Sequence, residues 1–172
     1  DRMDRGIGRV LDQLRAMDAW ENTLIVFLSD NGADATLLVR GDGHDQSSPP
    51  GAAESFLCLG PGWASAANAP FRRHKIWVHE GGIATPLIAC WPAGIAVPAV
   101  GRLVRDPGHL IDLMATCLEM AGTRLPKTWN GANSTPLEGA SLIPAFRAQP
   151  VQRGNPLFWE HEGQRAVREG RW

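Results

Sequence analysis

Two short stretches of the sequence carry side chains that could do chemistry. The first is Ser29-Asp30-Asn31-Gly32, which follows an apolar run and offers one carboxylate and one amide. Their oxygen atoms are the hard donors that Ca²⁺ and Mg²⁺ prefer in proteins. Asp, Asn and Gly are also the usual residues of an ordinary turn. On these four residues alone, the turn is the favoured interpretation.

The second stretch is rich in cations and ends in a glycine pair. Five basic or histidine side chains lie within eight residues, namely Arg72, Arg73, His74, Lys75 and His79, and Glu80-Gly81-Gly82 follows. A cluster of this kind could hold an anion such as phosphate or sulfate. The alternative is a solvated basic surface, which is the preferred interpretation for Arg72 and Arg73.

An opening helix and two apolar strands must position these stretches. Apolar residues recur at helical spacing over residues 3–17, which predicts an amphipathic helix with one buried face. The runs at residues 23–28 and 85–91 are continuously apolar, as is typical of strands covered on both faces in a parallel sheet. The first chemical stretch follows the earlier strand, where open α/β sheets place their ligands.

The remaining segments give weaker signals. Residues 55–59 could form a third strand, and the apolar spacing over residues 110–118 predicts a helix. Prolines make residues 123–153 mainly an ordered loop, and Glu-Gly turns within residues 157–172 predict the start of an antiparallel sheet. The predicted central strands are fewer than the four to six strands of an ordinary sheet. We therefore expect part of a larger α/β domain.

Composition excludes several classes of protein. The 172 residues include 44% hydrophobic side chains, which argues against intrinsic disorder. The net charge is −1, so we expect no nucleic-acid partner and no binding to an anionic membrane surface. No apolar run is long enough for a transmembrane span. The three cysteines form no C-x-x-C pair, which excludes a zinc ribbon and a dense disulfide scaffold.

Taken together, these motifs resemble the C-terminal portion of a sulfatase, of the arylsulfatase type in the alkaline-phosphatase-like superfamily. Residues 29–32 match the family's Ser-Asp-Asn-Gly element, and residues 75–82 match its lysine motif, a Lys with four residues and then Glu-Gly-Gly. Trp91-Pro92-Ala93-Gly94 fits the segment that follows. Residues 109–122, 137–142 and 159–163 also fit in the family's order, although Ala115 stands where a proline is usual.

The resemblance implies a fold and a division of the chain. The expected fold is a partial alkaline-phosphatase-like sandwich with a mostly parallel central sheet. Residues 1–153 would be the C-terminal part of the sulfatase α/β domain. Residues 154–172 would begin a small C-terminal subdomain with an antiparallel sheet.

The resemblance also assigns site residues. Asp30 and Asn31 would ligate a divalent cation, most often Ca²⁺ in the family. Lys75 would be catalytic and would bind the sulfate group, because a fixed ammonium stabilises charge on the sulfuryl and leaving oxygens or donates a proton. His79 would line the substrate pocket, with a packing or surface role as the alternative. The substrate would be a small aryl or sugar sulfate ester.

The family's nucleophile has no counterpart here. Sulfatases convert Cys or Ser in C/S-x-P/A-x-R to formylglycine, whereas the pentapeptide that begins at Cys90 ends in Gly94 and follows the lysine motif. We therefore expect the formylglycine and the other metal ligands upstream of Asp1. The missing N-terminal half of the domain would be this chain's partner, and the chain alone would be inactive.

Two other functions stay open at this point. One is a phosphonate or phosphodiester hydrolase of the same superfamily, which shares the Asp-Asn metal element. The other is a degenerate relative that binds an anion or a carbohydrate without catalysis. Localisation is also open between cytoplasmic and periplasmic or exported, because a targeting segment would precede Asp1.

Overall fold

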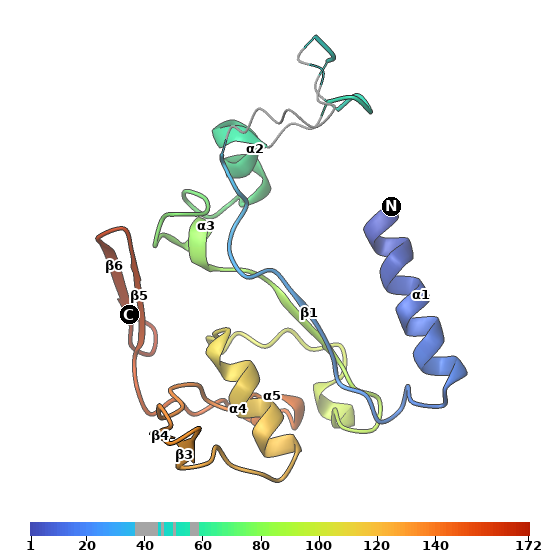
Figure 1. Cartoon of the computed structure of the whole chain (residues 1–172), viewed down its shortest axis with the longest axis vertical. Helices are drawn as coiled ribbons and strands as arrows, with labels where there is room; N and C mark the ends of the chain where they lie inside the picture. The colour runs from blue at the N-terminus through green and yellow to red at the C-terminus, as the bar shows by residue number, and fades with distance from the viewer. Residues whose placement is uncertain (37–44, 46, 50, 56–58) are drawn as a thin grey trace. The chain divides into compact units, whose positions relative to one another are not determined.

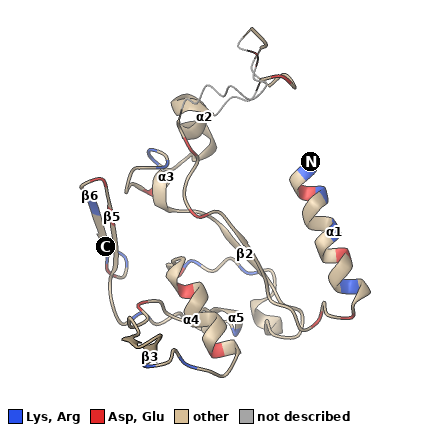
Figure 2. Cartoon of the chain, in the orientation of Figure 1, with Lys and Arg blue, Asp and Glu red and all other residues tan. Residues whose placement is uncertain are grey.

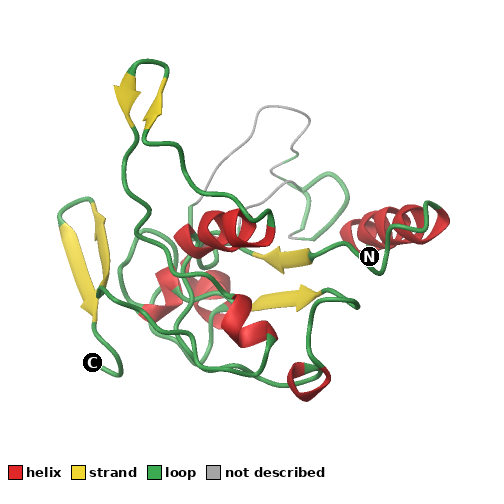
Figure 3. Cartoon of the chain, turned by 90° about the horizontal axis from the view of Figure 1, so that it is seen from below, coloured by secondary structure: helices red, strands yellow, loops and turns green. Residues whose placement is uncertain are grey.

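The computed structural model describes residues 1–36, 45, 47–49, 51–55 and 59–172, and the chain is of the mixed α/β class, as predicted (Figure 1). Loops join short helices and strands (Figure 3). The elements are α1 (Arg2–Ala16), β1 (Ile25–Leu28), α2 (Gly60–Ala67), α3 (Glu80–Ile83), β2 (Leu87–Cys90), the 3₁₀ turn η1 (Val97–Ala99), α4 (Ile111–Met120), β3 (Thr128–Trp129), β4 (Ala132–Asn133), α5 (Ile143–Phe146), β5 (Leu157–His161) and β6 (Gln164–Arg168). The strand predicted at residues 55–59 falls mostly outside the described residues.

The described residues divide into two compact units. One unit contains Asp1–Phe27, Ile88–Pro156 and Glu169–Trp172, and the other contains Leu28–Leu87 and Leu157–Arg168. The second unit therefore holds both of the stretches that the sequence marks as chemical. Within the described ranges, no helix has the length and apolar composition that a membrane span requires.

Strands β1 and β2 pair in a two-stranded sheet. At one end the Thr85 hydroxyl donates to Ser29 O at 2.8 Å, and at the other Ala93 N donates to Glu21 O at 2.9 Å. The beginning of β2 therefore lies beside the end of β1, and the two strands run antiparallel. The mostly parallel sheet predicted above is not found in this pair. Continuous apolarity indicates coverage of both strand faces, which is usual in parallel sheets but does not by itself fix the direction of a strand.

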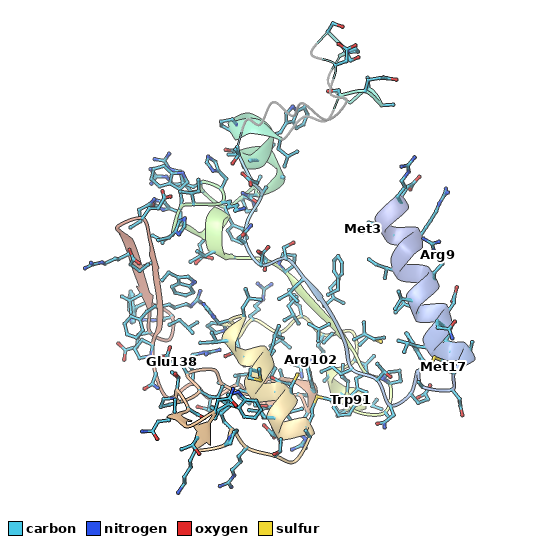
Figure 4. The ribbon with its side chains drawn as sticks, in the orientation of Figure 1. Met3, Arg9, Met17, Trp91, Arg102 and Glu138 are labelled. Carbon is cyan, nitrogen blue, oxygen red and sulfur yellow. The ribbon has the colours of Figure 1, made fainter. Side chains whose placement is uncertain are left out.

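The apolar face of the opening helix is at most partly buried among the described residues. The helix predicted at the start is confirmed as α1, which carries both acidic and basic residues along its length (Figure 2). None of its residues is buried, and Met3 and Met17 are 69% and 64% exposed (Figure 4). The predicted burial of one helix face is therefore not found among the described residues.

The first unit has its core around α5. Leu142, Ile143 and Phe146 are buried there. Partly buried apolar side chains surround them, namely Leu24, Ala89, Trp91, Ile95, Leu113 and Val151. The helix predicted over residues 110–118 is confirmed as α4. Its C-cap is Ala121, and Gly122 follows at φ 61°, the left-handed value typical of the residue just after a C-cap.

Turn chemistry explains where loops and strands differ from the predictions. Residues 123–153 were expected to be mainly loop, but β3 and β4 form an antiparallel hairpin there. Asn130 and Gly131 join these strands with φ of 48° and 80°, the pair of positive φ values that a tight hairpin turn requires. The predicted C-terminal antiparallel sheet is confirmed as the β5–β6 hairpin, with Glu162 and Gly163 at its turn.

Candidate active site

Glycines let the two chemical stretches pack backbone against backbone. Gly32 N donates to Gly82 O at 2.9 Å, and Gly81 N donates to Arg72 O at 2.9 Å. A Cβ on Gly32 would lie 1.8 Å from Gly81 O, and a Cβ on Gly81 would lie 2.1 Å from Arg73 O. No real Cβ approaches so closely, so Ser-Asp-Asn-Gly and Glu-Gly-Gly meet only because these positions lack side chains.

Lys75 is held beside the end of the Ser-Asp-Asn-Gly segment. Its backbone N–H donates to Ala33 O at 3.0 Å, and its ammonium lies 3.2 Å from Asp34 Oδ2. The neighbouring Arg73 and Ile76 have φ of 71° and 87°. A β-branched residue in this region is strained, and such strain persists only where surrounding contacts impose it. The lysine loop is therefore fixed rather than free.

Asp34 is itself held in place by Thr36. The Thr36 backbone N–H and hydroxyl both donate to Asp34 Oδ1, at 2.8 and 2.6 Å. The hydroxyl bond is the main reason that the pKa of Asp34 falls from 3.8 to about 2, followed by the Thr36 backbone bond and the bond from Lys75. The carboxylate is therefore ionised at neutral pH, with one oxygen anchored and the other facing the ammonium.

Asp30 and Asn31 line a cavity of about 360 Å³. The other lining residues are Ser29, Gly32, Ala33, Ala67, Asn68, Ala84, Thr85 and Pro86. Asn31 donates its side-chain N–H to Gly32 O at 2.9 Å, so its amide oxygen is the atom left to bind a cation. Within the described part of the chain, neither Lys75 nor His79 is among the lining residues.

The side chains at this cavity offer the oxygen ligands that a hard cation prefers, but too few of them to complete its coordination. Asp30 and Asn31 supply oxygen ligands, which Ca²⁺ and Mg²⁺ prefer. Ca²⁺ takes six to eight oxygen ligands, and no group of three His, Cys, Asp or Glu side chains among the described residues could hold a metal ion. The described residues can therefore provide only part of a metal site.

His79 lies at the start of α3, beside an aromatic group. It is the residue before Glu80–Ile83, and its ring centroid is 6.2 Å from that of Trp77. The Arg73 guanidinium lies over the same Trp77 ring, 4.2 Å from its centroid. Arg73 remains exposed, in keeping with the basic surface predicted for it. A role of His79 in binding substrate stays a prediction.

Sequence reasoning missed Asp34 and Asn68. Asn68 accepts from Ala33 N at 3.0 Å and donates to Arg73 O at 3.2 Å, so it joins the two chemical stretches. Ala33 alone separates Asp34 from Asp-Asn-Gly, and Asp34 begins an Asp-x-Thr turn. This turn is a local signal that could have been found in the sequence. Asn68 carries no such signal, because both of its partners are set by tertiary contacts.

Thr36→Val is expected to raise the pKa of Asp34 more than Lys75→Met does. The Thr36 hydroxyl is the largest cause of the low value, whereas Lys75 comes after both Thr36 bonds. The folded carboxyl titrates below its unfolded value, so its contribution to stability is present above about pH 4 and is lost as the pH falls toward 2. NMR titration of the Asp34 side chain checks the order. A larger rise in Lys75→Met would contradict it.

Comparisons of this chain with known proteins identify its relatives. A family model described as Sulfatase matches residues 1–123. A sulfatase of Schizosaccharomyces pombe is 32% identical over 99% of this chain and 32% of its own length. An arylsulfatase of Klebsiella aerogenes is 30% identical over 81% of this chain and 32% of its own.

A solved structure is similar as well. The crystal structure of Ps i-CgsB in complex with k-i-k-neocarrahexaose has a TM-score of 0.67 and 25% identity, over 98% of this chain and 31% of that one. This chain therefore spans about a third of the length of the relatives described. The family match covers well over half of the 172 residues and includes both chemical stretches. This chain belongs to the sulfatase family.

Proposed function

We propose that this chain forms the part of a sulfuric ester hydrolase that binds a divalent cation and the sulfate group of a sulfate monoester. The observation that supports it most directly is the packing of Ser-Asp-Asn-Gly against Lys-x₄-Glu-Gly-Gly through Gly32, Gly81 and Gly82. This packing brings a candidate cation site and a fixed ammonium into one unit of the fold. Membership of the sulfatase family supports sulfate ester hydrolysis in general.

Lys75 is the proposed catalytic and sulfate-binding residue. An ammonium has three N–H donors, and among the described residues Asp34 engages one of them, which leaves two to meet sulfuryl oxygens. Positive charge fixed there would stabilise the charge that develops on the sulfuryl and leaving oxygens. The side chain is 43% exposed, so an anion can reach it from solvent. His79, four residues along, is proposed to contact the substrate.

Asp30 and Asn31 are the proposed cation ligands, with Ca²⁺ as the expected ion. Such an ion, when bound, neutralises charge on the sulfate group and orients it. The exposed Asp30 carboxylate and the Asn31 amide oxygen would supply two of its ligands. Residues outside this chain would have to supply the rest, in keeping with the short ligand set described above.

The nucleophile is proposed to come from the N-terminal part of a sulfatase domain. The 172 residues contain no C/S-x-P/A-x-R pentapeptide, so a formylglycine would have to be provided from outside them. That partner would also cover the exposed apolar strand residues Phe27 and Ile88, which are 46% and 62% exposed. The isolated chain is therefore expected to bind sulfate without hydrolysing its esters. Aryl and sugar sulfates are both proposed substrates.

Anion and cation titrations of the chain test this function. We expect Ca²⁺ to bind weakly, as measured by calorimetry, and Asp30→Ala to abolish that binding. Inorganic sulfate should shift the NMR signals of Lys75, and Lys75→Met should remove saturable binding. A wild-type chain that responds to neither ion would contradict the proposal and would favour a degenerate relative. Hydrolysis of an aryl sulfate above the level of a Lys75→Ala control would contradict the proposed inactivity of the chain alone.

A further inference from the structure

We infer that Asp34 is a specificity-determining residue, which disfavours doubly charged anions at Lys75 and so favours singly charged sulfate esters. The inference rests on the proposed function, because it assigns the anion at Lys75. A sulfate monoester carries one negative charge at neutral pH. Free sulfate carries two, and a phosphate monoester carries between about 1.5 and 2. A fixed negative charge beside the site therefore acts differently on these ligands.

The geometry keeps the Asp34 carboxylate close to any anion that Lys75 binds. Oδ1 is anchored by both Thr36 bonds, and Oδ2 lies 3.2 Å from the Lys75 ammonium. The backbone bond from Lys75 N to Ala33 O, at 3.0 Å, joins the two segments next to the pair. The Lys75 and Asp34 side chains are 43% and 46% exposed, so a ligand meets the pair at the surface.

Charge decides the direction of the effect. A ligand on the free N–H groups of Lys75 would have its charge roughly 6 Å from the carboxylate, where two unit charges in water change a binding constant by about threefold. A doubly charged ligand would lose about tenfold, because the repulsion doubles. Asp34 also orders the Lys75 side chain, which favours anion binding and so opposes the repulsion. This opposing effect is weak, because half-exposed ion pairs contribute little free energy.

Anion titrations of the whole chain test the inference. Sodium sulfate and sodium methyl sulfate are titrated at fixed, low ionic strength, and binding is followed through the NMR signals of Lys75. Asp34→Asn keeps an oxygen acceptor for Thr36 and removes the charge. We expect it to tighten sulfate binding about tenfold and methyl sulfate binding about threefold, and added salt to reduce both gains. Asp34→Ser repeats the measurement if Asp34→Asn alters the amide spectrum.

Asp45 offers a matched control. Its Oδ1 accepts from the Ser47 backbone N–H and hydroxyl at 2.8 and 2.6 Å, the same turn that Asp34 makes, while its Oδ2 accepts from the Ser48 hydroxyl. Asp45→Asn removes the same charge from the same unit, and we expect both affinities to stay unchanged.

The outcomes separate this inference from the proposed function. Equal changes for the two anions in Asp34→Asn, or none, would overturn the inference while Lys75→Met still abolishes binding. Asp45→Asn acting like Asp34→Asn would also overturn it, since the effect would then be that of net charge. Wild-type binding that is absent, or that Lys75→Met does not change, would overturn the proposed function and the inference with it.

Discussion

Gly32→Ala is expected to destroy the proposed site and to destabilise the unit that contains it. The new Cβ would lie 1.8 Å from Gly81 O and 2.8 Å from Gly81 C, which are backbone atoms and cannot rotate away. The segments must separate, and the bond from Gly32 N to Gly82 O is lost with them. We expect the free energy of unfolding to fall by about 2–4 kcal/mol, as for other severe overpacking. Urea denaturation measures this loss, and saturable sulfate binding at Lys75 should disappear.

Gly62→Ala is the matched control in the same unit. Gly62 lies within α2, and a Cβ added there would meet no heavy atom within 4 Å. Alanine should therefore stabilise the helix by about 0.5–1 kcal/mol, because glycine is the poorer helix former. Sulfate binding should be unchanged. If Gly32→Ala unfolds at the wild-type urea concentration and still binds sulfate, the glycine contacts do not position the site.

This dependence on glycine shows how far the sequence could predict the site. Asp30, Asn31 and Lys75 could be proposed as functional only from the resemblance of the ordered set of motifs to the sulfatase family, because a turn is the favoured interpretation of residues 29–32 alone. The contact between the motifs could not, because Gly32 and Gly81 are far apart in the chain and neither carries a local signal of its partner. Glycine is also common in turns, so its presence does not distinguish a turn from a close approach of two backbones.

The pairing of Lys75 with Asp34 likewise could not be predicted from local sequence alone. The Asp-x-Thr turn that anchors Asp34 is local and can be read from sequence. The lysine lies 41 residues away, and its loop reaches Asp34 through the backbone bond to Ala33 O. Local patterns therefore predict which side chains are held rigidly, whereas the pairing depends on how the loop between them folds.

The elements were easier to predict than their surroundings. The apolar runs that became β1 and β2 were found, and so were α1 and α4, because their periodicity is local. The same runs predict burial on both strand faces, yet Phe27 and Ile88 are 46% and 62% exposed. An apolar run indicates that a face is to be covered and does not identify what covers it. The proposed N-terminal part of the domain would supply that cover.

Asp112→Ala is expected to have the second large effect, on the stability of the first unit. Asp112 is fully buried on α4, and its carboxylate pairs with both terminal nitrogens of Arg153. It also accepts from Ala140 N and His109 N, each at 2.8 Å. One carboxylate thus fixes the loop before α4 and the loop that leads to α5. Its removal leaves two backbone donors without an acceptor, and it leaves the Arg153 guanidinium with only the neutral Pro107 O, at 3.1 Å, in place of a carboxylate.

The size of the effect follows from the burial of Arg153. Its side chain is only 14% exposed, so the guanidinium cannot regain full hydration when its partner is lost. Breaking a buried ion pair by removing one member costs about 3–5 kcal/mol, mostly from the charge left behind. We expect a loss of that size in urea denaturation. The double variant Asp112→Leu with Arg153→Met should recover much of it, since no charge then remains buried.

Asp12→Ala on α1 provides the exposed comparison. Arg15 and Asp12 pair at 2.8 Å, but their side chains are 51% and 76% exposed. Such surface pairs contribute about 0–1 kcal/mol, so this variant should unfold almost as the wild type does. Similar losses in Asp112→Ala and Asp12→Ala would contradict the argument from burial. A double variant no more stable than Asp112→Ala would instead show that the backbone bonds from Ala140 and His109, rather than the unpaired Arg153, dominate the loss.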